Sequence, residues 1–216
     1  MKGVRRSTAK KMVESVRIAP HVTHMAEADV TELVKLREGQ KEFAQNKGIH
    51  LTYLPFVIRA VVATLKQYPY LNSSVDDQNE EIILKKYYNI GVAVDTEDGL
   101  IVPVVKGADQ KSLLKLAQEI QGLAEKARSR EIDLADLKGG TFTITNIGFI
   151  GGTHATPIIN YPETAILAMG RIYDKAVVRN NEIVVRKVMP LSLSFDHRVI
   201  DGVMGGQIHE CSHSLP

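Results

Sequence analysis

The spacing of apolar residues predicts four helices. The first covers about residues 5–16, where Ala9, Met12, Val13 and Val16 fall on one side. A second is expected to open at Asp29, because Glu32 three positions later completes a capping box, and to end at Gly48. Its expected buried stripe comprises Leu33, Leu36 and Phe43.

Two further helices are expected in the middle of the chain. Pro55 suits a first helical turn, and apolar positions continue at helical spacing to Leu65 before the break at Pro69. Asp109 is expected to cap the last helix, whose apolar face runs from Leu113 to Ala127.

Short runs rich in β-branched residues predict the strands, and most of them lie in the last third of the chain. The expected strands cover residues 21–28, 82–85, 90–95, 100–105, 142–146, 165–172, 176–179, 183–188 and 191–195. Helices early and antiparallel-looking strands late favour an α+β fold, in which helices pack on one face of a mixed β-sheet as a two-layer sandwich.

Composition excludes several classes of protein. The 216 residues are 44% hydrophobic and 24% charged, with a formal net charge of +2, so neither a nucleic-acid partner nor a membrane is indicated. The apolar stretch 54–65 carries Arg59 and is too short to span a bilayer. No secretory signal is recognised, so we expect the cytoplasm, or the mitochondrial matrix of a eukaryote. Cys211, His209 and His213 fit no standard zinc spacing, and no metal is expected.

The strongest candidate chemistry lies where the predicted strand 191–195 ends. His197 follows that strand, and Asp201 and Gly202 come four and five residues later. A histidine can accept and return a proton near neutral pH, and a strand end gives it a fixed position. On these residues alone a structural histidine beside an ordinary Asp-Gly turn is the more usual interpretation.

The segment Asp196–Gly202 (DHRVIDG) resembles the active-site signature of the dihydrolipoamide acyltransferases, whose His-x-x-x-Asp-Gly core is shared with chloramphenicol acetyltransferase. Three further stretches are similar to that family in order and spacing: RRSTAKKMVES from residue 5, NIGVAVDTEDGLIVPVV from residue 89 and GGTFTITNIGFIGG from residue 139. The segment DVTELVKLRE from residue 29 is most similar to the branched-chain and related lipoate acyltransferases.

The resemblance implies a chloramphenicol-acetyltransferase-like fold and an acyl transfer between dihydrolipoamide and coenzyme A. It implies that His197 is the general base, that the Thr145 hydroxyl stabilises the oxyanion, and that Asp201 holds the local structure through a salt bridge with Arg5 or Arg6. Family relatives often have serine where this chain has Thr145. The family's coenzyme A contacts fall on Arg37, Thr52, Asp95, Asn146, Gly170 and Ile172.

The resemblance also implies partners. The family forms homotrimers, with the histidine and the hydroxyl of one site on neighbouring subunits, and the trimers join into larger cages. Lipoamide is carried on separate lipoyl domains, and the decarboxylase and dihydrolipoamide dehydrogenase components complete the complex. The resemblance does not separate acetyl, branched-chain and succinyl substrates, which differ by small changes in pocket volume.

We expect residues 1–216 to form one catalytic domain without lipoyl or peripheral-subunit-binding domains, and with an atypical tail from about residue 208. Two alternatives stay open. One is a same-fold acyltransferase with another acceptor. The other is a catalytically silent scaffold of such a complex, against which the presence of His197 argues.

Overall fold

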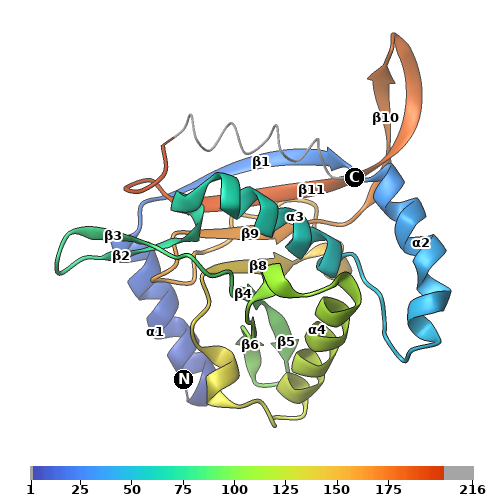
Figure 1. Ribbon diagram of the computed structural model, residues 1–216. Coiled ribbons are helices and arrows are strands. Elements are labelled where there is room, and N and C mark those ends of the chain that lie inside the picture. Colours follow the sequence, from blue (N-terminus) through green and yellow to red (C-terminus); the bar gives the residue numbers. More distant parts are fainter. Residues whose placement is uncertain (1, 202–216) are drawn as a thin grey trace.

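A mixed β-sheet forms the centre of the molecule in the computed structural model, which describes residues 2–201 (Figure 1). Within these residues the sheet has seven strands, in the order β1-β11-β9-β8-β4-β7, with β10 paired to β11. The strands are β1 (His21–Asp29), β4 (Ile90–Val92), β7 (Val104–Val105), β8 (Phe142–Asn146), β9 (Ala165–Met169), β10 (Tyr173–Arg179) and β11 (Glu182–Asp196).

The main sheet contains both parallel and antiparallel strand pairs. Strand β8 runs parallel to both β4 and β9, whereas β11 is antiparallel to β1, β9 and β10. Two small antiparallel ribbons lie outside the main sheet, formed by β2 (Ser73–Asp76) with β3 (Glu81–Leu84) and by β5 (Val94–Thr96) with β6 (Gly99–Ile101). The expected mixed sheet is confirmed.

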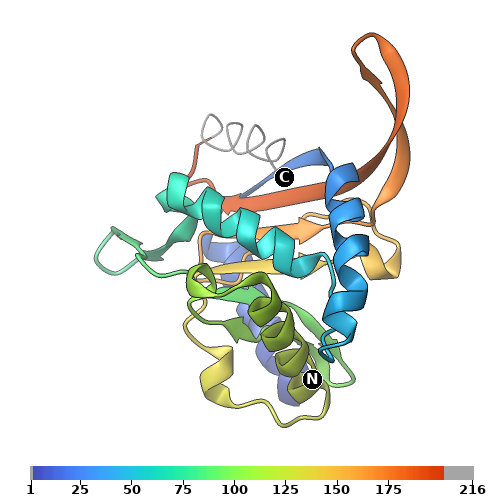
Figure 2. The same cartoon turned by 45° about the vertical axis from the view of Figure 1, so that its right-hand side comes forward.

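Four α-helices occur in the described part of the chain: α1 (Gly3–Ile18), α2 (Thr31–Gln45), α3 (Leu54–Gln67) and α4 (Leu113–Arg128). Short 3₁₀ segments are η1 (Pro69–Asn72), η2 (Ala108–Gln110), η3 (Leu134–Leu137) and η4 (Gly148–Ile150). Helix α3 crosses one face of the sheet (Figures 1 and 2) and buries Ile58, Val61, Val62 and Leu65 against it, as its apolar spacing predicts.

The main core lies between α3 and the sheet. Phe142 and Ile144 from β8, Leu167 from β9 and Phe195 from β11 are all buried in it, with Leu116 of α4. Burial of such side chains removes several hundred Å² of apolar surface from water, at about 25 cal/mol per Å². This layer holds the ends of β8, β9 and β11 in fixed relative positions.

Several predicted strands have different bounds. Residues 183–188 and 191–195 belong to the single strand β11, which continues through Met189 and Pro190. The predicted strands 90–95 and 100–105 each divide in two, because β4 and β7 join the main sheet while β5 and β6 form a separate ribbon. The strand predicted to reach residue 172 ends at Met169, and β2 was not predicted.

Both predicted aspartate caps are wrong. Helix α4 is capped by Ser112, whose Oγ accepts from the backbone N–H of Lys115 at 3.3 Å, while Asp109 lies 3.8 Å from the Lys66 ammonium. Asp29 belongs to β1 and its Oδ1 accepts from Thr31, and Glu32 pairs with Lys35 instead of completing a box. Strand pairing to β11 extends to Asp29 and displaces the helix start to Thr31.

The apolar sides predicted for the first two helices are largely exposed in this chain. Val13 and Val16 of α1 are 51% and 56% exposed, and Leu36 and Phe43 of α2 are 45% and 50% exposed. Helical spacing predicts which residues share a face, but it does not say whether the same chain covers that face.

The β10–β11 hairpin projects beyond the body of the molecule (Figures 1 and 2). It is tied to β1 by ion pairs, since Arg179 and Arg186 both contact Asp29, at 2.8 and 2.7 Å. Burial alone would raise the pKa of Asp29, but hydrogen bonds from Thr31 and Arg186 outweigh it and lower the pKa to about 2. Among the described residues, no helix is long and apolar enough to cross a bilayer.

Candidate active site

The two residues on either side of His197, Asp196 and Arg198, form an ion pair with each other. Asp196, the last residue of β11, is 2% exposed and accepts from Arg198 Nε at 3.0 Å and Nη2 at 2.7 Å. The backbone N–H of Arg198 also donates to Asp196, at 3.0 Å. Such a forked contact restricts the two residues that flank the histidine. His197 is therefore exposed to solvent on a turn whose backbone is held in place.

A second carboxylate extends this support. Asp77, in the turn between β2 and β3, accepts from Arg198 Nη1 at 2.6 Å and from the Tyr161 hydroxyl at 2.5 Å. These two hydrogen bonds lower the pKa of Asp77, and the same contact raises the pKa of Tyr161 to about 12. No role was predicted from the sequence for Asp77, Tyr161 or Arg198, although the opposite charges of Asp196 and Arg198 on either side of His197 were a usable signal.

Residues after the histidine return to the core. The backbone N–H groups of Val199 and Ile200 donate to the Asp196 carbonyl at 3.0 Å, and Ile200 is fully buried in the main core. Asp201 follows at the surface. Its predicted salt bridge with Arg5 or Arg6 stays a prediction.

Thr145 lies near the end of β8, half-buried, and pairs in register with Ala168 of β9. Two residues earlier, Thr143 points to the same side of the strand and donates to Glu163 Oε2 at 2.6 Å. Asn160 donates to the other oxygen of Glu163 at 3.0 Å. Burial raises the pKa of this carboxyl to about 7 in spite of the two hydrogen bonds.

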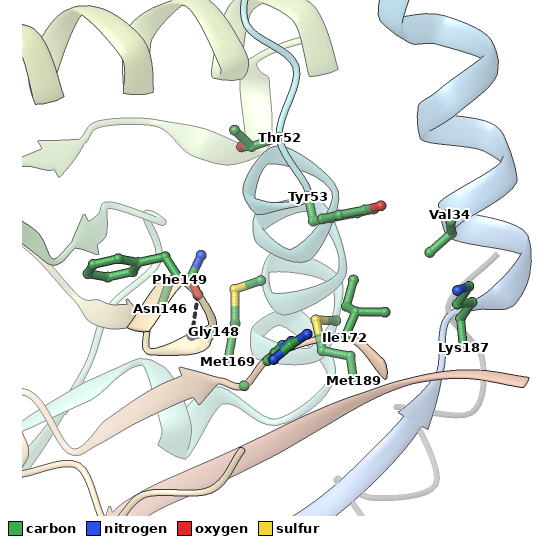
Figure 3. A pocket seen from close by; sticks show the side chains of 12 residues that line it. Val34, Thr52, Tyr53, Asn146, Gly148, Phe149, Met169, Ile172, Lys187 and Met189 are labelled. Atoms are coloured by element: carbon green, nitrogen blue, oxygen red, sulfur yellow. Dashed lines mark hydrogen bonds between the residues drawn. The ribbon is translucent and has the colours of Figure 1, made fainter. Parts of the chain in front are cut away.

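A cavity of about 420 Å³ opens beyond the ends of β8 and β9 (Figure 3). Helix α2 contributes to one side of it, and the segment preceding α3 and the loop after β8 contribute to others. Its lining residues are Val34, Thr52, Tyr53, Asn146, Gly148, Phe149, Met169, Gly170, Arg171, Ile172, Lys187 and Met189.

The cavity brings together four of the six residues predicted to contact coenzyme A, namely Thr52, Asn146, Gly170 and Ile172. A fifth, Arg37, lies beside it, because its guanidinium stacks 5.4 Å from the ring centroid of Tyr53 and its Nε donates to the Leu51 carbonyl at 2.9 Å. Asp95 is exposed in the β5–β6 ribbon and does not line the cavity, so its role stays a prediction.

The cavity carries positive charge and no acidic lining residue. Arg171 and Lys187 both line it, and Lys187 is balanced by Asp174 at 2.8 Å. Met169, Met189 and Ile172 supply an apolar floor (Figure 3). This combination suits an elongated ligand with an anionic end and an apolar arm. Arg171, Lys187 and Phe149 were not predicted as site residues from the sequence.

His197 and Thr145 lie toward opposite ends of the sheet. Thr145 pairs with Ala168, Ala168 pairs with Ser192, and five more residues of chain lead from Ser192 to His197. At the rise of an extended strand these five residues span about 17 Å. In one chain, therefore, the histidine is out of reach of both the hydroxyl and the cavity.

No group of three or more metal-ligating side chains occurs among residues 2–201. The histidines and the cysteine of the 209–213 segment, and the predicted atypical tail, lie outside the described residues.

Comparison with known proteins gives consistent matches. Residues 1–213 match the family model of the 2-oxoacid dehydrogenases acyltransferase (catalytic domain). Over 202 residues the chain is 55% identical to the dihydrolipoyllysine-residue acetyltransferase component of the pyruvate dehydrogenase complex of Bacillus subtilis, covering 94% of this chain and 46% of that protein. The chain thus spans about half the length of the curated relatives it matches.

Solved structures agree. A dihydrolipoamide acetyltransferase of Azotobacter vinelandii superposes with a TM-score of 0.93 at 43% identity, covering 97% of this chain and 88% of that one. The cubic core of a pyruvate dehydrogenase multienzyme complex gives 0.95 at 42% identity, covering 100% and 90%.

A chloramphenicol acetyltransferase gives a TM-score of 0.56 at 15% identity, covering 99% of this chain and 95% of that one, which is a likeness of fold alone and confirms the predicted fold class. The match of nearly the whole chain to one family model, together with these structures, places the chain in the 2-oxoacid dehydrogenase acyltransferase catalytic-domain family.

Proposed function

We propose that this chain transfers an acyl group between dihydrolipoamide and coenzyme A, as the catalytic core of a 2-oxoacid dehydrogenase complex. The observation that carries the proposal is the arrangement of the sheet. One end exposes His197 on a rigid turn, and the other end carries Thr145 on β8, next in sequence to Asn146, which lines a cationic, partly apolar cavity. Each end supplies what the other lacks for acyl transfer between thiols.

In the proposed reaction His197 acts as the general base. Its imidazole removes the proton from the attacking thiol, because a free thiol is mostly protonated at neutral pH and the thiolate is the nucleophile. The sulfur attacks the thioester carbonyl carbon, and the carbonyl oxygen becomes an oxyanion. When the tetrahedral species collapses, the bond to the leaving sulfur breaks and the histidine returns its proton to that sulfur.

Thr145 is the proposed donor to the oxyanion. A hydroxyl held on a strand keeps its direction through the reaction, and one such donor is worth about 3 kcal/mol of transition-state stabilisation. In the Azotobacter relative, a serine, a histidine and an asparagine were investigated for their role in the catalytic mechanism. That serine and histidine stand as many residues apart as Thr145 and His197, and its asparagine follows the histidine at the spacing of Asp201.

Coenzyme A is the proposed occupant of the cavity. Arg37 and Arg171 offer planar guanidinium groups for its phosphates, while Met169, Met189 and Ile172 suit the less polar arm. We propose that dihydrolipoamide, carried on a separate lipoyl domain, approaches the same reacting centre. The acyl group that the site prefers is left to experiment, although the curated relative from Bacillus is an acetyltransferase.

A second subunit is required by this proposal. Because His197 and Thr145 of one chain are about 17 Å apart along the sheet, and the cavity lies further still from His197, a complete site needs the histidine of one chain and the hydroxyl and cavity of a neighbour. A homotrimer closes three such sites by symmetry. A larger cage, lipoyl domains, the decarboxylase and dihydrolipoamide dehydrogenase components, and a location in the cytoplasm or mitochondrial matrix belong to the same proposal.

A steady-state assay with free dihydrolipoamide and acetyl-, isobutyryl- or succinyl-coenzyme A tests it. We expect transfer of at least one acyl group, and we expect His197→Ala to lose most of it because the base is gone. Thr145→Ser should stay close to the parent rate, whereas Thr145→Ala should lose about 100-fold in kcat. Full activity of a folded His197→Ala variant would exclude the mechanism, and an inactive parent trimer would favour the silent scaffold.

A further inference from the structure

The connection between α1 and β1 contains a histidine with a defined hydrogen-bonding role. His21, the first residue of β1, is partly buried. Its Nδ1 lies 2.7 Å from the Ala19 carbonyl oxygen, and its Nε2 lies 2.9 Å from the backbone nitrogen of Ile159. The two ring nitrogens thus join two backbone segments that are distant in sequence.

These contacts determine the tautomer of His21. A backbone N–H can only donate, so Nε2 must accept from Ile159 and carries no hydrogen. Nδ1 then carries the hydrogen and donates it to the Ala19 carbonyl, which can only accept. The neutral imidazole satisfies both groups at once, and few other side chains offer a donor and an acceptor at this separation.

The Ile159 peptide is held from its other side as well. Its carbonyl accepts from the Ser15 hydroxyl at 2.7 Å, and Ser15 and Ile159 are both fully buried. Ile159 also packs with Ala19 and Ile166 in a small apolar cluster. Ser15, His21 and the Ile159 peptide therefore form a buried polar junction between α1, β1 and the segment preceding β9.

This junction lies directly against the turn of His197. The backbone N–H of His197 donates to the carbonyl of Pro20 at 2.9 Å, and Pro20 stands between Ala19 and His21. His21 is also the register partner of Asp196, the residue before His197. A shift of residues 19–21 would consequently move the acceptor that fixes the backbone of His197.

We propose that His21 is a positioning residue for His197, acting through the Ala19–His21 backbone; the inference rests on the proposed function of His197. The side chain does not approach the reacting atoms. It holds the peptide of Pro20 in place, and through it the histidine that must meet the cavity of a neighbouring chain. Because an error of about 1 Å in a catalytic group can cost about 100-fold in rate, such a support matters for turnover.

Three substitutions separate this role from packing. His21→Phe fills the space but leaves the Ile159 N–H and the Ala19 carbonyl without partners. His21→Gln can place its amide oxygen near the position of Nε2 and keep the bond to Ile159. His21→Asn can place its amide nitrogen near Nδ1 and keep only the bond to Ala19.

Each variant is compared with the parent and with His197→Ala in the acyl-transfer assay, at matched oligomeric state by gel filtration. We expect kcat to fall about tenfold or more in His21→Phe and His21→Asn and to recover toward the parent in His21→Gln. The KM for coenzyme A should stay unchanged, because the cavity is at the other end of the sheet.

The possible failures are distinguishable. If His197→Ala keeps its activity, the proposed function itself is wrong. If His197→Ala is inactive while His21→Asn and His21→Gln share one kcat, the function stands and the positioning role of His21 is overturned. The comparison of His21→Asn with His21→Gln tests the positioning role of His21 even if His21→Phe does not fold. A rise in the KM for coenzyme A with an unchanged kcat also contradicts the inference.

Discussion

Among single residues, Glu163 shows burial and hydrogen bonding acting in opposite directions on one pKa. It is 6% exposed, and burial raises its pKa to about 7 although Thr143 and Asn160 both donate to it. Gly140 approaches the carboxyl so closely that an added Cβ would lie 2.8 Å from Oε1. Loss of water from the charged form therefore outweighs the two hydrogen bonds.

This raised pKa predicts a pH-dependent stability. The protonated carboxyl is the form that folding favours, so its contribution is fully present below the unfolded pKa of 4.5 and is lost as the pH rises through about 7. The side chain of the Glu163→Gln variant cannot titrate. From pH 5 to pH 8 we therefore expect the free energy of unfolding to fall less in this variant than in the parent, with a difference of about 3 kcal/mol at most. Urea denaturation at a series of pH values and one protein concentration measures this free energy. The same dependence on pH in both proteins would contradict the prediction.

At the scale of elements, the end of β9 depends on a close approach of backbones. A Cβ at Gly170 would lie 2.1 Å from the Thr153 carbonyl oxygen and 3.0 Å from the Pro190 side chain. The Gly170 N–H donates to the Pro190 carbonyl at 2.8 Å, and the Arg171 N–H donates to Gly152 at 2.8 Å. These contacts bring the loop after β8 against β9 and β11 and form one wall of the cavity.

We expect Gly170→Ala to destabilise the fold by about 3 kcal/mol and to weaken coenzyme A binding, because the loop must move away. Gly39→Ala is the matched control, since its Cβ would meet nothing within 4 Å on α2. There the same change should stabilise the helix by about 1 kcal/mol. Urea denaturation and a coenzyme A titration test both, and equal stability of the two variants would refute the steric argument.

At the scale of the whole molecule, the sheet separates the two halves of the proposed site. Strand β11 carries His197 at one end and Lys187 and Met189, which line the cavity, toward the other. The strand is paired with β1 from Val188 to Asp196 and with β9 from Leu191 to Phe195, so no local movement brings its ends together. Apolar residues left exposed on α1 and α2 are available for contacts between chains.

A subunit-mixing experiment tests the shared site. Trimers of His197→Ala and Thr145→Ala chains are each expected to be nearly inactive, but unfolding and refolding them together should restore activity. At equal mixing about one quarter of the sites would combine an intact histidine with an intact neighbouring hydroxyl. The same proteins mixed without unfolding are the control. An inactive refolded mixture would place both residues in a site within one chain.

Features that depend on local spacing along the chain are predictable from the amino-acid sequence alone. Helix α3 was predicted with its buried face because its apolar residues repeat at the helical period. The His197 turn and the strand carrying Thr145 were located, and the family was identified and is confirmed, because runs of neighbouring residues carry that information. The expected mixed sheet with helices on it followed from the order of elements.

Features that depend on contacts between residues distant in sequence emerge only from the folded chain. Register alone shows that β11 is one strand and that His197 and Thr145 lie far apart. The raised pKa of Glu163 and the tautomer of His21 arise from partners up to 138 residues away, which no local pattern specifies. The same holds for the exposure of Val13, Val16, Leu36 and Phe43. Periodicity groups side chains on a face, but long-range packing determines what covers that face.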